Sequence, residues 1–301
     1  MSTLRLTLFL LFGLLLVALP ASAQKVDPLT GQVVEQAPPP EPEAPVTADL
    51  TEANELVRKQ KFPEAEALLA EMQAEFPDDA RLLTMRGELL VALGKPKEAI
   101  PLLQRVTELE PERDRVRFQL GSALASTGDS EGAIEAFGGE LEVSKDPQVR
   151  VLSHLNRSML FQQKRSWKEA ADELASAMEL DPSRGQGWTD LASLRLEAED
   201  LDAAIAALEK GAAAGYESAS HYYSVGARLV KAERYDQAIP LFEKVLAIDA
   251  KHARAVRSLA ASLDETGKKS EATNQWKRYL ELAPKANDAE QVRRRLASAG
   301  N

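Results

Sequence analysis

Residues 83–111 read LTMRGELLVALGKPKEAIPLLQRVTELEP. Apolar residues recur every three or four positions on both sides of Gly94, which indicates two amphipathic helices joined by a turn. Ala99 and Leu103 are four positions apart and share one face of the second helix. Pro111 ends that helix, because a proline ring cannot continue the backbone hydrogen-bond ladder. The stretch therefore predicts a helix, a turn and a second helix.

The same pattern repeats along most of the chain, with intervals of 34, 34, 37, 34, 34 and 34 residues between seven alanines. The alanines are Ala65, Ala99, Ala133, Ala170, Ala204, Ala238 and Ala272. Four positions after them come the large apolar residues Leu69, Leu103, Phe137, Leu174, Leu208, Phe242 and Trp276. A unit of this length cannot bury its own apolar face, so it must stack on its neighbours. We therefore expect an array whose function lies in its extended surface.

In five of the seven units the first helix carries a small residue where two helices are expected to cross closely. These residues are Gly87, Gly121, Ala192, Gly226 and Ala260. The first-helix motifs are Leu83-x2-Arg86-Gly87-x2-Leu90, Arg117-x2-Leu120-Gly121-x2-Leu124, Trp188-x2-Leu191-Ala192-x2-Arg195, Tyr222-x2-Val225-Gly226-x2-Leu229 and Val256-x2-Leu259-Ala260-x2-Leu263. Together with the later alanine and proline they resemble the tetratricopeptide repeat, W-x2-L-G-x2-Y, then A-x3-F, then P. The resemblance implies an all-α fold, a right-handed superhelical solenoid of about seven helix-turn-helix units.

In this phasing the repeats occupy 46–286, about four fifths of the chain. The units are 46–79, 80–113, 114–150, 151–184, 185–218, 219–252 and 253–286. Residues 287–301 are expected to form a C-terminal capping helix and tail, because Asn287 and Glu290 make a start like a capping box. The fifth unit departs from the pattern, and its second helix is predicted to stop early at Gly215, with Tyr216 covering the turn.

One interval is three residues longer than the others, between the third and fourth units. The extra residues are expected near 143–148, with the helix-ending proline displaced to Pro147. Gly138 and Gly139 also weaken the second helix there. Two interpretations remain open: an ordinary loop insertion, or a hinge that divides the array into three plus four repeats.

Residues 1–23 have the composition of a signal peptide, with Arg5, an apolar run and Ala21-Ser22-Ala23 before an expected cleavage at Gln24. We expect export to the periplasm or secretion; an uncleaved anchor is the alternative. The chain has no cysteine, which excludes a lipid anchor, disulfides and thiol catalysis. Residues 24–45 are a linker rich in proline and glutamate, expected to be a spacer, with a docking motif for a proline-binding module as the alternative.

The formal net charge of −10 argues against nucleic acid as a ligand, because phosphates require a basic face. The basic run Arg293-Arg294-Arg295 is expected to favour the end of the last helix instead. No spacing of metal ligands, phosphate-binding loop or nucleophile motif is found, and the three histidines and three tryptophans are expected to be packed or surface residues. The sequence predicts no cofactor, no metal and no enzymatic activity.

The resemblance implies that a ligand lies along the concave face formed by the first helices. The residues of that face not used in packing are predicted to be Arg81, Met85, Arg115, Phe118, Gln119, Leu155, Asn156, Met159, Gln162, Gln186, Thr189, Asp190 and Tyr223. Four of them, Phe118, Leu155, Met159 and Tyr223, are large and apolar, as in a peptide-binding patch. The alternative is that an error in phase or closure of the superhelix buries them.

We therefore expect a non-enzymatic scaffold or adaptor that binds a peptide or helix of a partner protein in the concave groove. Export together with the resemblance implies a role in an envelope-assembly or secretion complex. The lysine, asparagine and arginine clamp by which some family members hold chaperone tails is missing, since Phe118, Thr189 and Leu50 occupy its cationic sites. The alternatives are a self-associating structural protein and, third, an enzyme or sugar-binding protein on a repeat scaffold.

Overall fold

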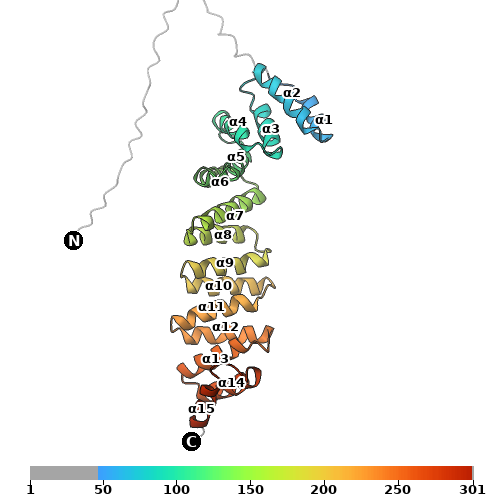
Figure 1. The fold of residues 1–301 in the computed structure, drawn as a ribbon. Coiled ribbons are helices and arrows are strands. Elements are labelled where there is room, and N and C mark those ends of the chain that lie inside the picture. Colours follow the sequence, from blue (N-terminus) through green and yellow to red (C-terminus); the bar gives the residue numbers. More distant parts are fainter. Residues whose placement is uncertain (1–46, 300–301) are drawn as a thin grey trace, which may run out of the picture. The chain divides into compact units, whose positions relative to one another are not determined.

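The computed structural model describes residues 47–299 (Figure 1). The expected signal peptide and the expected linker lie outside the described residues. Within the described part the chain folds into fifteen helices and no strand. The expectation of an all-helical solenoid built from helix pairs is confirmed.

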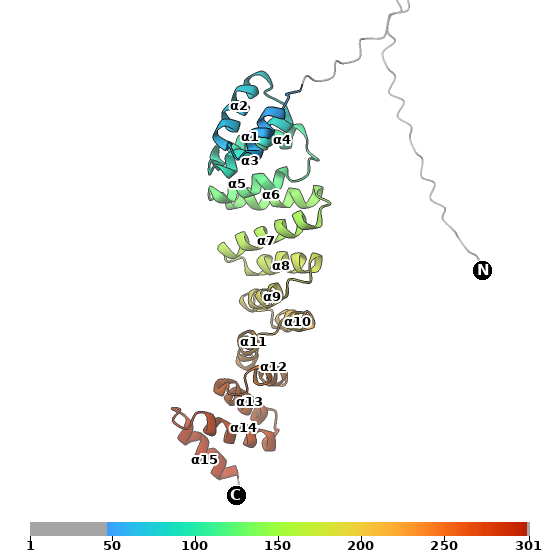
Figure 2. The same ribbon diagram turned by 90° about the vertical axis from the view of Figure 1, so that its right-hand side faces the viewer.

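Seven helix pairs follow one another in chain order, and a single helix comes last (Figure 2). The pairs are α1 (Thr51–Arg58) and α2 (Phe62–Glu75), α3 (Ala80–Ala92) and α4 (Pro96–Leu109), α5 (Val116–Ser126) and α6 (Ser130–Val143), α7 (Pro147–Gln163) and α8 (Trp167–Leu180), α9 (Gly185–Glu197) and α10 (Leu201–Ala213), α11 (Ala219–Lys231) and α12 (Tyr235–Ile248), and α13 (Ala253–Glu265) and α14 (Lys269–Leu282), before α15 (Ala289–Ala299). Each pair packs internally, and its second helix also contacts the first helix of the next pair.

Three glycines of the first helices, Gly87, Gly121 and Gly226, lie against the large apolar residue of the partner helix. A Cβ atom added at Gly87 would lie 2.8 Å from Cδ2 of Leu103, and one at Gly226 would lie 2.9 Å from Cε1 of Phe242. All seven repeat alanines are fully buried beside these contacts. Close packing at this crossing therefore explains why the sequence pattern demands a small residue.

The three extra residues of the long interval lengthen a helix and do not form a loop. α6 runs without a break through Gly138 and Gly139 to Val143, and α7 has 17 residues where α3, α9, α11 and α13 have 13. Pro147 begins α7, four residues ahead of the expected fourth unit, and Asp146 caps it by accepting a hydrogen bond from the Gln148 amide at 2.9 Å. Proline is tolerated in the first turn, where its missing N–H has no helical partner. The loop interpretation is therefore wrong, and the hinge stays a prediction.

The apolar core is interrupted where α6 meets α7. One cluster of buried side chains belongs to the first three pairs and includes Leu160 of α7; the other runs from Val151 to Val292. Buried polar residues lie at this boundary: Glu140, Ser144, Ser153 and Ser158. The core is thus divided into three pairs and four pairs.

Glu140 lies in α6 at a repeat position that Val106 and Val245 occupy in other units. Its carboxylate accepts hydrogen bonds from the backbone amides of Arg115, at 2.7 Å, and Phe118, at 3.1 Å. Arg115 has a positive φ of 70° and caps α5 with no side-chain hydrogen bond. Burial raises the pKa of the Glu140 carboxyl, although the two amides favour its charged form. Glu140 therefore replaces the missing cap of α5 from the neighbouring helix.

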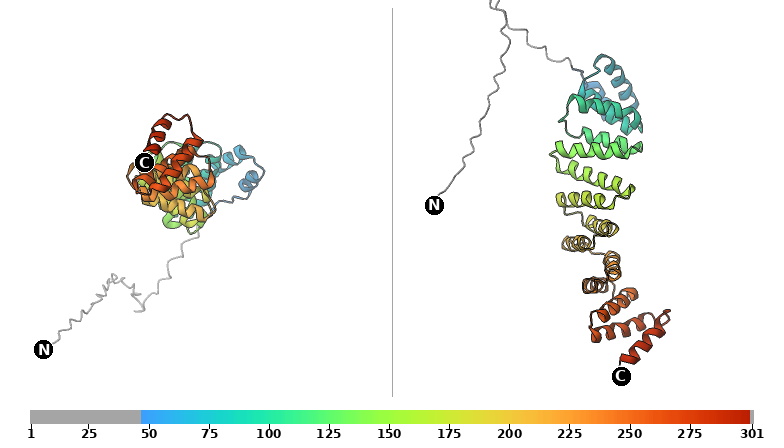
Figure 3. Two further views of the ribbon diagram at one scale, coloured as in Figure 1. Left: turned by 90° about the horizontal axis from the view of Figure 1, so that it is seen from below. Right: turned by 90° about the vertical axis from the view of Figure 1, so that its left-hand side faces the viewer.

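The last helix is fastened by a buried carboxylate. The Asp264 carboxylate accepts a hydrogen bond from the Trp276 indole N–H at 2.6 Å, and it pairs with the Arg295 guanidinium, also at 2.6 Å. Arg295 also lies over the Trp276 ring, and Val292 is buried in the second core cluster. Figure 3 shows the last helix, α15, at the end of the array that is marked C. Arg295 of the basic run thus holds the capping helix against α13 and α14. In the fifth unit, α10 stops at Ala213 and Gly215 has a φ of 79°, as expected for an early end.

The crossing predicts opposite effects for two glycine substitutions. Gly226→Ala should lower the free energy of unfolding by about 1–3 kcal/mol, because the buried Phe242 ring must move. Gly138→Ala should raise it by up to about 1 kcal/mol, because its Cβ would lie at an ordinary 3.7 Å from Arg157 and alanine favours the helix. Denaturant unfolding followed by circular dichroism measures both. Equal shifts in the two variants would contradict a tight crossing.

A second test concerns the buried carboxylate. Glu140→Ala should lower the free energy of unfolding by about 2 kcal/mol, because two backbone amides at the start of α5 lose their acceptor. Glu135→Ala is the control: this carboxylate is exposed on the same helix, and its loss should change stability by less than about 0.5 kcal/mol. A Glu140 variant as stable as the control would show that α5 needs no cap.

Candidate functional site

The first helices α3, α5, α7, α9, α11 and α13 expose one side, which we call the first-helix face. Three pairs of neighbouring first helices approach each other directly: α3 and α5, α9 and α11, and α11 and α13. All the predicted partner-binding residues lie on these helices, except Arg115, which directly precedes α5 as its capping residue. The first-helix face is therefore the surface that the sequence predicts to bind a partner.

The most exposed apolar side chains of this face lie on α7. Leu152 is 41% exposed and Met159 is 47% exposed, seven positions apart on one side of the helix, with half-buried Leu155 between them. Asn156 and Gln162 flank them and bond within the helix, Asn156 to the Leu152 carbonyl at 2.9 Å and Gln162 to the Ser158 hydroxyl at 3.4 Å. The stripe carries no charge. Leu152 was missed by the sequence prediction, although its spacing of three from Leu155 could have identified it.

Phe118 and Tyr223 are half-buried and support the packing of their own units. The Phe118 ring meets Phe137 edge-on, with centroids 5.4 Å apart. Tyr223 lies 5.9 Å from the Phe242 ring and 5.1 Å from the His252 ring. Leu155 likewise packs against the core. Met159 is therefore exposed, whereas Phe118, Leu155 and Tyr223 are half-buried and pack against neighbouring core residues. Contact of these four side chains with a partner stays a prediction.

Thr189 is the clearest error among the predicted residues. It occupies the repeat position of Phe118 and Tyr223, but its side chain is shorter and only 1% exposed. Its hydroxyl donates a hydrogen bond to the Gln186 carbonyl at 2.8 Å. A threonine at this position is covered by its surroundings, so it cannot touch a partner.

Three polar residues of the predicted set link consecutive units. Arg81 donates to the Ala48 carbonyl at 3.1 Å, and Arg115 pairs with Asp146 at 2.6 Å. Gln119 donates to Glu88 of α3. Their side chains remain partly accessible, but much of their hydrogen-bonding capacity serves the array itself. Met85 is half-buried against the first core cluster.

The C-terminal part of the face holds polar groups around a cavity. Asp190 is exposed, yet partial desolvation by the surrounding protein raises the pKa of its carboxyl, and nearby His221 opposes this rise. A cavity of about 450 Å³ between α11 and α13 is lined by Ser220, Tyr223, Ser224, His252, Ala253 and Arg254. The His252 ring already caps α13, accepting from the Ala255 amide at 3.1 Å. These residues offer contacts to a ligand but no convergent catalytic set.

Two absences concern only the residues that the structure describes. No group of three or more histidine, aspartate or glutamate side chains is placed to hold a metal ion. None of the helices between residues 47 and 299 has the length and apolar composition required to cross a membrane.

Comparison with known proteins agrees with this architecture. Two models of the tetratricopeptide repeat match residues 50–98, 84–147 and 229–296, together more than half of the chain. No curated protein matches the sequence.

Solved structures share the fold at low sequence identity. The C-terminal part of a TPR repeat-containing protein from Cytophaga hutchinsonii is 16% identical, with a TM-score of 0.51, over 81% of this chain and 99% of that one. A structure of Naa15/Naa10 bound to HypK-THB gives 16% identity and a TM-score of 0.59, over 83% of this chain and 38% of that one. A MamA protein gives 24% identity and a TM-score of 0.42, over 58% and 93% of the two chains. With its matched repeats and its seven helix pairs, this chain belongs to the tetratricopeptide-repeat family.

Proposed function

We propose that the chain is a non-enzymatic scaffold that binds a segment of a partner protein on the first-helix face, centred on α7. The observation that carries this is the exposure of Leu152 and Met159 on an uncharged stripe of α7. An apolar stripe flanked by amides suits the apolar side of a partner helix or an extended peptide. Arg81 and Arg115, in units that precede α7, are exposed.

The binding test compares two double variants with matched exposure. Leu152→Ser with Met159→Ser removes the α7 stripe, whereas Leu180→Ser with Ile248→Ser removes side chains that are 40% and 47% exposed at the ends of α8 and α12. A partner is first captured by cross-linking in the native host and then purified for titration. The first variant should weaken its binding by about tenfold or more, and the second should leave it unchanged.

Three outcomes would contradict the proposal. Equal loss in the two variants would indicate a general effect of surface apolarity, and undiminished binding to the α7 variant would place the site elsewhere. A mass that rises with concentration, measured by light scattering and lost with the α7 variant, would favour the self-associating alternative. Both variants are first checked for an unchanged helical spectrum, so that unfolding is not mistaken for loss of binding.

We further propose that the protein acts outside the cytoplasm, as an adaptor in an envelope-assembly or secretion complex. The support is the composition of residues 1–23. In the native host, mass spectrometry of the exported fraction should find a chain that begins at Gln24. A chain that keeps residues 1–23 in a membrane fraction would favour the uncleaved anchor, and a purely cytoplasmic chain would contradict export.

A further inference from the structure

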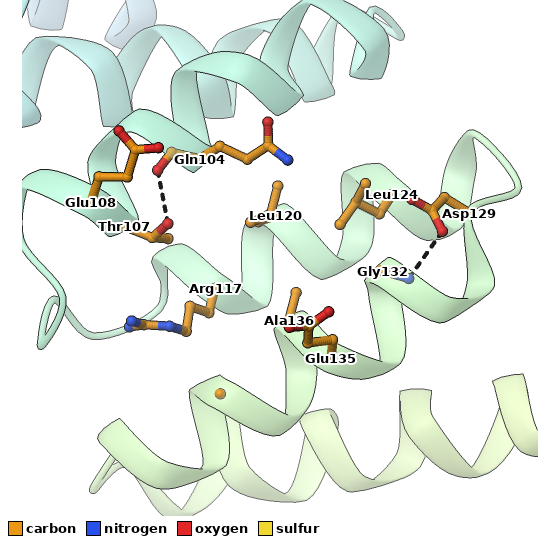
Figure 4. A pocket seen from close by; sticks show the side chains of 11 residues that line it. Gln104, Thr107, Glu108, Arg117, Leu120, Leu124, Asp129, Gly132, Glu135 and Ala136 are labelled. Carbon is orange, nitrogen blue, oxygen red and sulfur yellow. Dashed lines mark hydrogen bonds between the residues drawn. The ribbon is translucent and has the colours of Figure 1, made fainter.

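A second surface opens on the side of the array formed by the second helices. Between α4 and α6 lies a cavity of about 550 Å³ (Figure 4). Leu120 and Leu124 of α5 and Ala136 of α6 line its inner part, and all three are nearly buried. Glu108 of α4 and Glu135 of α6 stand on its opposite sides, with Asp129 at one end.

Comparison with the other units explains why the cavity is open. Arg105 of α4, Lys244 of α12 and Arg278 of α14 occupy the same repeat position in their units. Each reaches back to the loop that follows the preceding second helix: Arg105 to Asp78 at 2.8 Å, Lys244 to Glu217 at 3.2 Å, and Arg278 to the Ala250 carbonyl at 2.7 Å.

In α6 this position is Gly139, so the corresponding link back to the loop that follows α4 is missing. The place is partly taken by Arg117, whose Cδ would lie 2.8 Å from a Cβ at Gly139. Ala136 likewise replaces the leucines that α4 and α12 carry at its position, Leu102 and Leu241. The opening therefore follows from two small residues on one side of α6.

The charges around the cavity are mainly negative. Glu108, Asp129 and Glu135 line it, against the single guanidinium of Arg117, which bonds to the Pro111 carbonyl. Glu108 is paired with Arg105 at 2.8 Å, and Asp129 caps α6 through the Gly132 amide at 2.9 Å. Glu135 is exposed and has neither an ion pair nor a side-chain hydrogen bond among residues 47–299. A ligand that brings a positive charge would give it a partner.

We propose that this cavity is a second docking site, which takes a basic segment of a partner protein. A short aliphatic side chain enters between α4 and α6 and rests on Leu120 and Leu124, and a neighbouring lysine or arginine pairs with Glu135. The site is separate from the α7 stripe and does not depend on it. It would let one chain hold two protein segments at once.

Labelled peptides of twelve residues provide the probe. One set carries alanine, valine or leucine between lysines and arginines, and a matched set carries glutamate in place of the basic residues. Fluorescence anisotropy measures their binding to the full chain at physiological salt. Peptides of the basic set should bind, and those of the acidic set should not.

Three variants separate the site from a general attraction to an acidic protein. Glu135→Lys removes the charge partner, and Ala136→Leu fills the inner part of the cavity with the residue found in α4 and α12. Glu142→Lys makes the same charge change at an exposed position of α6 outside the cavity. Each of the first two should weaken binding by roughly fivefold or more, and the third should have little effect. The Leu152→Ser, Met159→Ser variant should bind like the wild type.

Two results would contradict a docking site for basic segments in this cavity: equal weakening of binding by Glu135→Lys and Glu142→Lys, or no preference for basic peptides. Undiminished binding to Ala136→Leu would also overturn it, because the cavity would then be unused. A concentration-dependent mass that Glu135→Lys abolishes would assign the cavity to a second copy of the chain instead. Unchanged circular dichroism of all variants is required before binding is compared.

Discussion

The close crossing of the two helices in each pair is the contact on which the rest of the array depends. Where Gly87 meets Leu103 and Gly226 meets Phe242, no room is left for a side chain on the first helix. This contact fixes which side of each first helix turns inward. The opposite side of each first helix stays free for other contacts. The helix crossing therefore determines which residues form the first-helix face. A protein built from such pairs gains stability locally, from each unit and its neighbours.

Most of the architecture could be predicted from the sequence, because the crossing requires small and large apolar residues that recur at a fixed spacing. The exception was the joint between the third and fourth units. A proline can end a helix or begin one, and spacing alone did not distinguish these cases for Pro147. The structure places it in the first turn of α7, with Asp146 as the cap. The three extra residues therefore extend the very helix that exposes the apolar stripe.

Individual site residues were less predictable than the face on which they lie. The repeat pattern predicts which way a side chain points, but it does not predict whether the side chains around it are long enough to cover it. Thr189 and Tyr223 share a repeat position, yet one is covered and the other stacks on two rings. Glu140 was missed for a related reason: an acidic residue at an apolar repeat position was visible, but the two amides that it binds became evident only from the fold.

The third and fourth units concentrate the departures from the repeat pattern, and each proposed docking surface is formed in part by one of them: the cavity lies between α4 and α6, and the stripe lies on α7. α6 lacks the bulk that would close the outer side of the array, and α7 exposes side chains that stacking does not use. The apolar core is interrupted between the same two helices. Residues that do not serve stacking are the ones available for recognition, and a repeat protein carries them where its pattern is broken. Near that place the carboxylates of Glu140 and Asp146 accept hydrogen bonds from backbone amides at the starts of α5 and α7.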